Sequence, residues 1–282
     1  MRKSLKWLNV ELSGVCNLAC VSCTFDSSLR TAVMTDETLQ AVFRETRTVD
    51  IGEIPWFNGG EIVTIPNKRL KQICAQINEE RVKNSPKWIS QVHTACTIMN
   101  EEKADILINS GAFDEIRISA DGPNKVFWEA NRIKHNKEPF PWEKLLQKLE
   151  ILLKANSKSK NPIKIKFWCL FPDQFKDPGP DKDFLDLLAK YPNAHQGYEG
   201  NRGLHQWIYG RPEGAPVPDG DCPWHYDQIV VMSDGNYTTC CNDLNGVNVY
   251  ANVHKMPLIE AMNLSYEERY TKIGCRTCVK GK

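Results

Sequence analysis

The chain has 282 residues, of which 41% are hydrophobic, enough to form a well-buried core. Its formal net charge is +1, which argues against a role that depends on electrostatic binding to nucleic acids or to membrane surfaces. The sequence contains no apolar run of about 18 residues and no signal-peptide pattern, so we expect a cytoplasmic protein without a transmembrane helix.

Short apolar runs alternate with helix-like stretches through about the first 200 residues. The patterns predict strands at residues 7–12, 53–58, 88–94, 113–119, 163–170 and 194–198. They predict helices between these strands at residues 35–48, 67–82, 101–110, 142–154 and 184–190, with Thr35 capping the first and Gly111 ending the third. This alternation indicates a parallel sheet in an α/β fold. Because a closed eight-stranded barrel needs about 250 residues, we expect a partial, TIM-like (β/α)6 barrel.

The C-terminal part of the chain has a different pattern. Residues 200–221 are rich in Gly and Pro, which predicts a linker or lid. Beyond them, Asp234-Gly235 lies between two apolar runs and predicts a β-hairpin, and a short helix is expected at residues 257–262. We therefore expect a barrel over residues 1–199, a linker over 200–221 and a small hairpin-and-helix domain over 222–282.

Three of the eleven cysteines form a C-x3-C-x2-C run, Cys16, Cys20 and Cys23, directly after the first expected strand. Loops at the carboxyl ends of parallel strands carry the chemistry of such folds. Three thiolates can hold a 4Fe–4S cluster and leave one iron open to a small molecule, whereas structural zinc sites take four protein ligands. The run therefore favours an open 4Fe–4S site over zinc.

Two other segments end expected strands and carry polar groups. The second strand ends in Asn58-Gly59-Gly60-Glu61, and the fourth ends in Ile118-Ser119-Ala120-Asp121-Gly122, with Arg132 downstream. Glycine lets the backbone approach a ligand closely, and a carboxylate suits an ammonium group. Together with the cysteine run, these segments predict one ligand site at the carboxyl ends of the strands.

The three segments together resemble the radical S-adenosylmethionine (SAM) superfamily, in which the open iron chelates the amino and carboxylate groups of SAM. The resemblance implies that Gly59, Gly60 and Glu61 bind the SAM amino group. It also implies that Ser119 contacts the ribose and that Arg132 contacts the SAM carboxylate. The chain departs from the family at Ser22, where an aromatic residue usually lies near adenine, and Phe25 is the candidate replacement.

A second set of cysteines surrounds the expected hairpin. Cys222 precedes it, Cys240 ends its second strand, and Cys275 and Cys278 form a terminal Cys-x2-Cys pair. Four thiolates can fully ligate a second cluster, although a zinc ribbon would use a similar set. The arrangement resembles the C-terminal SPASM domain in its shorter twitch form. The resemblance implies one auxiliary 4Fe–4S cluster, with Cys241 to spare.

Three isolated cysteines remain. Cys74 lies on the apolar side of a helix, where a buried, inert thiol is expected. Cys96 follows the third expected strand, and Cys169 lies near the end of the fifth. Cys96, Cys169 and Cys241 are therefore candidates for donating a hydrogen atom to a substrate radical, with small packing residues as the alternative.

By this resemblance the chain is an enzyme that cleaves SAM reductively, with flavodoxin or ferredoxin as electron donor, and abstracts a substrate hydrogen. The short twitch form favours oxidation of a small carbohydrate or aminocyclitol, with the auxiliary cluster as electron acceptor. Peptide modification ranks second, because we expect no leader-peptide domain before the first strand, and epimerisation ranks third. A non-catalytic zinc or iron–sulfur binding module is the alternative from another class, but it would leave Gly59-Gly60-Glu61 unexplained.

Overall fold

The computed structural model describes residues 2–21, 23, 25–26, 28–29, 31–120, 123–171, 179–196, 198–202, 227–241 and 243–269. Six strands form the barrel part: β1 (Ser4–Val10), β2 (Asp50–Pro55), β3 (Ile89–Thr94), β4 (Glu115–Ser119), β5 (Lys164–Phe171) and β6 (Tyr198–Arg202). Helices connect them: α1 (Asp36–Thr46), α2 (Asn67–Asn84), α3 (Glu101–Asn109), α4 (Lys125–Asn131), α5 (Trp142–Lys158) and α6 (Lys182–Lys190), with the 3-10 turn η1 (Ile62–Thr64).

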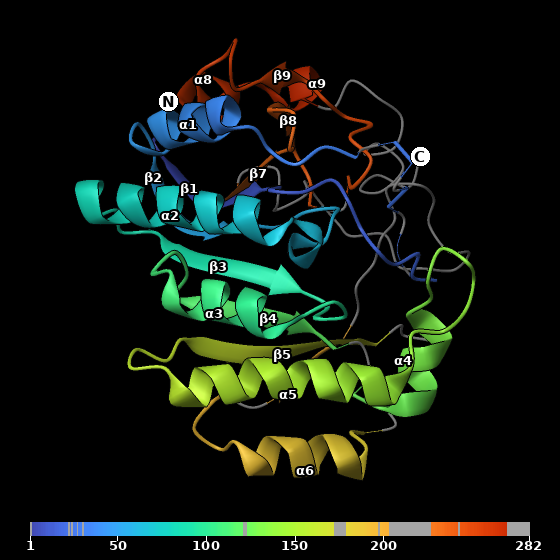
Figure 1. The fold of residues 1–282 in the computed structure, drawn as a ribbon. Helices are drawn as coiled ribbons and strands as arrows, with labels where there is room; N and C mark the ends of the chain where they lie inside the picture. The colour runs from blue at the N-terminus through green and yellow to red at the C-terminus, as the bar shows by residue number, and fades with distance from the viewer. Residues whose placement is uncertain are drawn as a thin grey trace.

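The six strands pair in parallel and in sequence order, with β1 beside β2 and β5 beside β6. In Figure 1, α2, α3, α5 and α6 lie side by side along one face of the sheet. The predicted α/β class and partial (β/α)6 barrel are confirmed. Thr35 also caps α1 as predicted, since its Oγ1 accepts a hydrogen bond from the Thr38 backbone N at 3.1 Å.

Several predicted boundaries were wrong. The last barrel strand begins at Tyr198 rather than 194, because buried Ala194 lies in a turn closed by its N–H to the Tyr191 carbonyl at 3.0 Å. Strand β2 ends at Pro55, although the apolar run continues through Trp56 and Phe57. Helix α4 was not predicted. The side chain of Asn124 caps its N-terminus by accepting from two backbone N–H groups.

The C-terminal hairpin joins the same sheet. Strands β7 (Gln228–Val231), β8 (Asn236–Thr238) and β9 (Ala251–Asn252) extend it beyond β1, giving the order β6-β5-β4-β3-β2-β1-β7-β8-β9. Strand β7 is parallel to β1, and β8 is antiparallel to β7. The predicted Asp-Gly turn is confirmed, with Gly235 in the left-handed region at φ +84°. The hairpin is thus continuous with the barrel sheet within the described residues.

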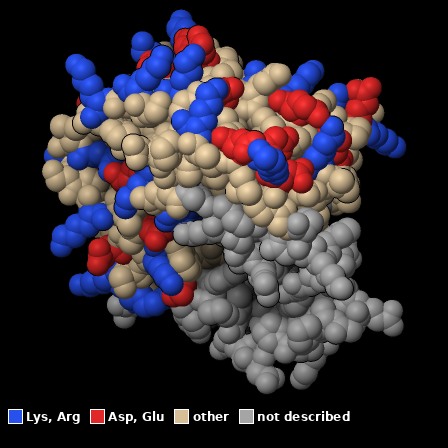
Figure 2. All heavy atoms as spheres, turned by 90° about the horizontal axis from the view of Figure 1, so that it is seen from below, with Lys and Arg blue, Asp and Glu red and all other residues tan. Residues whose placement is uncertain are grey.

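Two short helices follow, α8 (Leu258–Ala261) and α9 (Tyr266–Arg269). Figure 1 shows α8 next to α1, where the Leu258 backbone N donates to Glu45 Oε2 at 2.7 Å. None of the described helices has the length and apolarity that crossing a bilayer requires. On the face shown in Figure 2, basic and acidic side chains of the described residues are intermixed, in line with the small net charge.

Candidate active site

The loop after β1 holds Cys16, Cys20 and Cys23 at the carboxyl end of that strand. Backbone hydrogen bonds tie it to the segment at the end of α4: Ala19 N to the Ile133 carbonyl at 2.8 Å, and Val21 N to the Asn131 carbonyl at 2.9 Å. Cys16 and Cys20 are half-buried and Cys23 is exposed. The loop is therefore held in place by contacts that do not involve the thiols.

The loop carries three thiols, the donor type that an iron–sulfur cluster takes, but the structure does not gather them around one point. Burial raises the pKa of Cys16 to about 12, and the charges of Glu61, Cys20 and Cys23 raise it further. Such thiols become thiolates when a cationic centre offsets their mutual repulsion. Among the described side chains, no three of His, Cys, Asp or Glu are placed to hold a metal ion.

The turn after β2 carries Gly59, Gly60 and Glu61. A Cβ on Gly60 would lie 1.8 Å from the Ser13 carbonyl oxygen, so only glycine fits against the loop that follows β1. The buried Glu61 carboxylate accepts from Thr94 Oγ1 and from the Ala95 N–H, both at 2.6 Å. Burial raises the pKa of Glu61, against these hydrogen bonds and the charge of Arg132, which lower it. Glu61 therefore fixes the shape of the turn from inside the protein.

Arg132, at the end of α4, connects two of the predicted segments. Its Nη1 donates to Cys20 Sγ at 3.5 Å, and its Nη2 donates to the Ser119 carbonyl at 3.2 Å. The guanidinium carbon also lies 5.4 Å from the centre of the Trp128 ring. The cysteine run, the Gly-Gly-Glu turn and the Ser119 segment thus meet at the carboxyl ends of β1, β2 and β4.

The other predicted site residues are distributed as follows. Phe25 is half-buried, and its backbone N donates to Cys23 Sγ at 3.4 Å. Cys240 and Cys241 follow β8 as neighbours, and the hydrogen bond between their side chains lowers the pKa of Cys241, as does a weaker one with Gln228. Cys222, Cys275 and Cys278 lie outside the described residues, as do most of the predicted linker and the side chain of Cys169.

Cys96 lies at the carboxyl end of β3, but its thiol is turned away from the site. The residue has a left-handed backbone, φ +63°, which is unusual for a side chain other than glycine. Its Sγ lies 3.6 Å from the Lys148 carbonyl of α5, and the side chain is fully buried. Burial also raises the pKa of this thiol. This placement does not support a hydrogen-donor role for Cys96.

A row of polar residues on the inner face of the sheet was not predicted from the sequence. Glu53 accepts from Trp7 Nε1 at 3.2 Å and from Gln91 Nε2, across three neighbouring strands. Next to them, Glu115 pairs with Arg117 and, at 3.0 Å, with Lys166. The two-residue alternation in β2 to β5 was the available signal, since each polar residue alternates with a buried apolar one.

His93 belongs to the same inner face. Its ring stacks on Phe57, with centroids 4.7 Å apart, and meets the edge of Trp168 at 5.5 Å. Burial lowers the pKa of His93 to about 3, and the charge of Arg117 adds to this effect. Its Nε2 is buried and has no hydrogen-bond partner among the described residues. The ring is therefore neutral at physiological pH and held in place by its aromatic neighbours.

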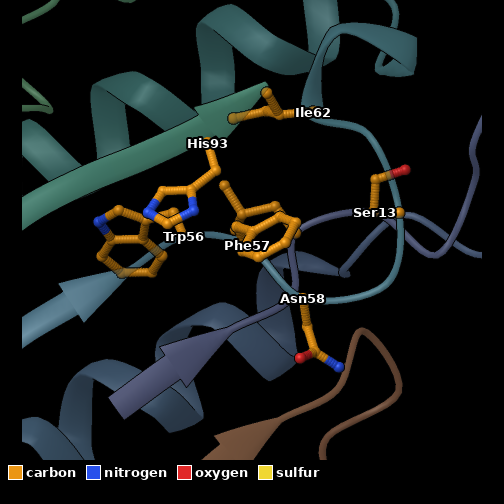
Figure 3. A pocket seen from close by; sticks show the side chains of 8 residues that line it. Ser13, Trp56, Phe57, Asn58, Ile62 and His93 are labelled. Atoms are coloured by element: carbon orange, nitrogen blue, oxygen red, sulfur yellow. The ribbon is translucent and has the colours of Figure 1, made fainter. Parts of the chain in front are cut away.

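A pocket lies beside the Gly-Gly-Glu turn (Figure 3), lined by Leu12, Ser13, Trp56, Phe57, Asn58, Gly60, Ile62 and His93. Its cavity volume is about 10 Å³, room for about one water molecule and far below the size of a ligand pocket. Figure 3 shows the amide of Asn58 pointing away from the stacked rings. That amide is 2% exposed and makes no hydrogen bond within the described residues, which marks Asn58 as a further candidate.

No family model and no curated protein sequence matches the chain. Solved structures do match. The structure of anSMEcpe with bound AdoMet has a TM-score of 0.61 at 16% identity and covers 98% of this chain and 83% of its own. BtrN in complex with AdoMet and 2-DOIA has a TM-score of 0.56 at 14% identity, and the match covers 98% of this chain and 90% of BtrN. Streptococcus suis SuiB bound to the precursor peptide SuiA has a TM-score of 0.64 at 10% identity, and the match covers 94% of this chain and 66% of SuiB. All three are radical SAM enzymes, and the chain has the fold that they share.

Proposed function

We propose that the chain is a radical SAM enzyme that oxidises a small carbohydrate or aminocyclitol-type molecule. The observation that carries this proposal is Arg132, which contacts both Cys20 Sγ and the Ser119 carbonyl. Because Arg132 reaches both the cysteine loop and the fourth strand, its guanidinium is placed to contact a ligand bound between them. Two proteins with this fold, anSMEcpe and BtrN, have AdoMet bound in their structures, which supports the same ligand here.

Each site residue has a role in this proposal. Cys16, Cys20 and Cys23 would hold a 4Fe–4S cluster, and Cys222, Cys240, Cys275 and Cys278 would hold an auxiliary one. When bound, these groups would supply the electron-transfer and radical chemistry for reductive cleavage of SAM and for oxidation of the substrate. Flavodoxin or ferredoxin would be the electron donor.

The protein's own part is to bind and orient the reactants. In this proposal the Gly59-Gly60-Glu61 turn binds the SAM amino group. Gly60 lets the turn pack against the Ser13 carbonyl, and Glu61 holds the turn through its internal hydrogen bonds. Ser119 and Arg132 would bind the ribose and the carboxylate. Holding the reactants in fixed positions would set the distance between the radical and the substrate.

The inner face of the sheet supports a small polar substrate. Hydrogen-bonding side chains line it beside the site, and His93 is neutral, so uncharged hydroxyl groups find partners there without the cost of burying a charge. The BtrN structure holds a small molecule, 2-DOIA, together with AdoMet. A secondary alcohol that loses a hydrogen atom from its carbon, a proton from its hydroxyl group and one electron becomes a ketone, which is the product we propose.

Peptide modification is the second candidate. Two structures with this fold are complexes with peptides, Cp18Cys with anSMEcpe and the precursor peptide SuiA with SuiB. The two candidates differ in their product: a small ketone in one case, and a peptide of altered mass in the other.

The test is an anaerobic assay with SAM, dithionite and panels of cyclitols and peptides. We expect the wild-type chain to form 5′-deoxyadenosine and to convert a cyclitol to a ketone. Cys20→Ala should abolish deoxyadenosine formation while leaving about four irons in the auxiliary site. Cys240→Ala should still form deoxyadenosine but no ketone. Deoxyadenosine formation that survives Cys20→Ala would show that the first-cluster assignment is wrong.

A further inference from the structure

Glu11 is a fully buried carboxylate between β1 and the cysteine loop. Its Oε2 accepts from the Gly59 backbone N at 3.0 Å. Its Oε1 accepts from Ser233 twice, from the backbone N at 3.2 Å and from Oγ at 3.0 Å. One side chain therefore receives three hydrogen bonds from two segments that lie 48 and 222 residues away along the chain.

The two segments belong to different parts of the proposed enzyme. Gly59 opens the Gly-Gly-Glu turn, where the SAM amino group is proposed to bind. Ser233 is buried and lies in the turn between β7 and β8, which leads directly to Cys240. The Glu11 backbone N also donates to the Val231 carbonyl at 2.8 Å, so the hairpin is bonded to Glu11 through main chain and side chain.

The strength of this connection follows from its chemistry. Hydrogen bonds to a carboxylate are shorter and roughly twice as strong as those between neutral groups. A buried carboxylate that loses a donor keeps the cost of desolvation without the compensating bond. A shift of either turn away from Glu11 therefore carries a penalty that the other turn cannot remove.

We propose that Glu11 is a positioning residue that sets the Gly59-Gly60-Glu61 turn against the C-terminal hairpin, so that SAM binding at the turn and the state of the Cys240 segment are coupled. The proposal rests on the proposed function, because it takes SAM as the ligand of the turn. Coupling of this kind is reciprocal: what the hairpin does to SAM affinity, SAM does to the hairpin by the same factor.

Two substitutions test the hydrogen bonds that Glu11 accepts from Gly59 and from Ser233. In Glu11→Gln the amide keeps one acceptor oxygen but turns an NH2 group toward the other donors, so either Gly59 or Ser233 loses its acceptor. Ser233→Ala removes only the Oγ donor. We expect the SAM dissociation constant to rise about tenfold in Glu11→Gln, which corresponds to about 1.4 kcal/mol, and about threefold in Ser233→Ala.

Glu80→Gln is the matched control. Glu80 is also a buried carboxylate, but it lies on α2 and pairs with Arg47 in the helical layer. Its substitution should lower the urea midpoint of unfolding and leave the SAM dissociation constant within about twofold of the wild-type value. If Glu80→Gln weakens SAM binding as much as Glu11→Gln does, the effect is general destabilisation and the proposal is wrong.

The coupling itself is measured with the reconstituted protein in a double-mutant cycle. Cys240→Ala should weaken SAM binding in the wild-type background by a few-fold, and should have no further effect when combined with Glu11→Gln. Equal effects of Cys240→Ala in both backgrounds, or an unchanged SAM dissociation constant in Glu11→Gln, would overturn the proposal. If Glu11→Gln does not fold, Ser233→Ala takes its place in the cycle.

Failure of the proposed function gives a different result. A wild-type chain that binds no SAM would contradict that function, while the connection between Glu11 and Ser233 would still be measurable in urea unfolding. The loss in the free energy of unfolding of the double variant Glu11→Gln, Ser233→Ala should be smaller than the sum of the losses in the two single variants. Simple additivity would show that the two residues are not coupled and would overturn the positioning role as well.

Discussion

The two faces of the parallel sheet are built from different side chains and are buried to different degrees. The face toward the helices carries Trp56, Val92, Ile116, Ile118 and Phe167, each at most 1% exposed. The inner face carries Glu53, Gln91, His93, Glu115 and Arg117. Gln91 donates to Glu53 across β3 and β2, and Arg117 pairs with Glu115 within β4. Parallel strands covered on both faces are usually apolar throughout. The polar inner face therefore departs from the usual pattern of a covered parallel sheet, whereas the face toward the helices follows it.

The largest loss of stability is expected from a substitution on the face of the sheet that packs against the helices. Phe167 is fully buried and meets Phe184 of α6 edge to face, with centroids 5.2 Å apart. Phe167→Ala leaves a cavity between the sheet and α6, so we expect a loss of about 4 kcal/mol in the free energy of unfolding, measured by urea titration. A loss below about 1 kcal/mol would contradict the view that this face carries most of the stability.

The second prediction concerns the pH dependence of stability on the inner face. Burial lowers the pKa of His93 from 6.5 to about 3. Between these pH values the unfolded chain binds a proton at His93 that the folded chain does not, so stability falls as the pH falls, by about 1.4 kcal/mol per pH unit. We expect His93 to account for about 3 kcal/mol of stability lost by pH 4.

His93→Phe isolates this contribution, because phenylalanine keeps the stacking on Phe57 and removes the titrating group. The measurement is the urea midpoint of wild type and variant between about pH 7 and pH 4. The variant should be about as stable as the wild type at neutral pH and should lose less stability on acidification. Parallel curves for the two proteins would show that His93 does not titrate across folding in this range.

The smallest effect is expected at the ion pairs of the inner face. Arg117→Leu removes one of two cations from the buried Glu115 and leaves Lys166 at 3.0 Å. Because the carboxylate keeps one partner, we expect a loss of about 2 kcal/mol at neutral pH, below the range for an abolished buried pair. A urea titration that shows no loss would mean that the Glu115 cluster contributes nothing to stability.

Patterns over short distances in the sequence were sufficient for most of the fold and for part of the site. Thr35 as helix cap and the Asp-Gly turn were predicted because each depends on bonds within a few residues. The cysteine run and the Gly-Gly-Glu turn were placed correctly at strand ends, since strand polarity alone determines which end of the sheet they occupy. Whether these residues bind iron and SAM stays a prediction.

Contacts between distant segments were not predictable in this way. The pairing of β7 with β1 and the bonds from Ser233 to Glu11 join segments more than 200 residues apart, and no local pattern encodes them. The direction of the Cys96 side chain was likewise not predictable from the sequence. Its position after β3 suggested a catalytic thiol, but its left-handed backbone turns the side chain toward α5.

Radical SAM chemistry in this chain is best tested by the iron and sulfide content of the anaerobically purified protein, measured together with 5′-deoxyadenosine formation from SAM and dithionite. We predict about eight irons per chain and deoxyadenosine as a product. About four irons with deoxyadenosine would keep the Cys16, Cys20 and Cys23 site and remove the auxiliary cluster. Zinc in place of iron, with no deoxyadenosine, would contradict the proposed function.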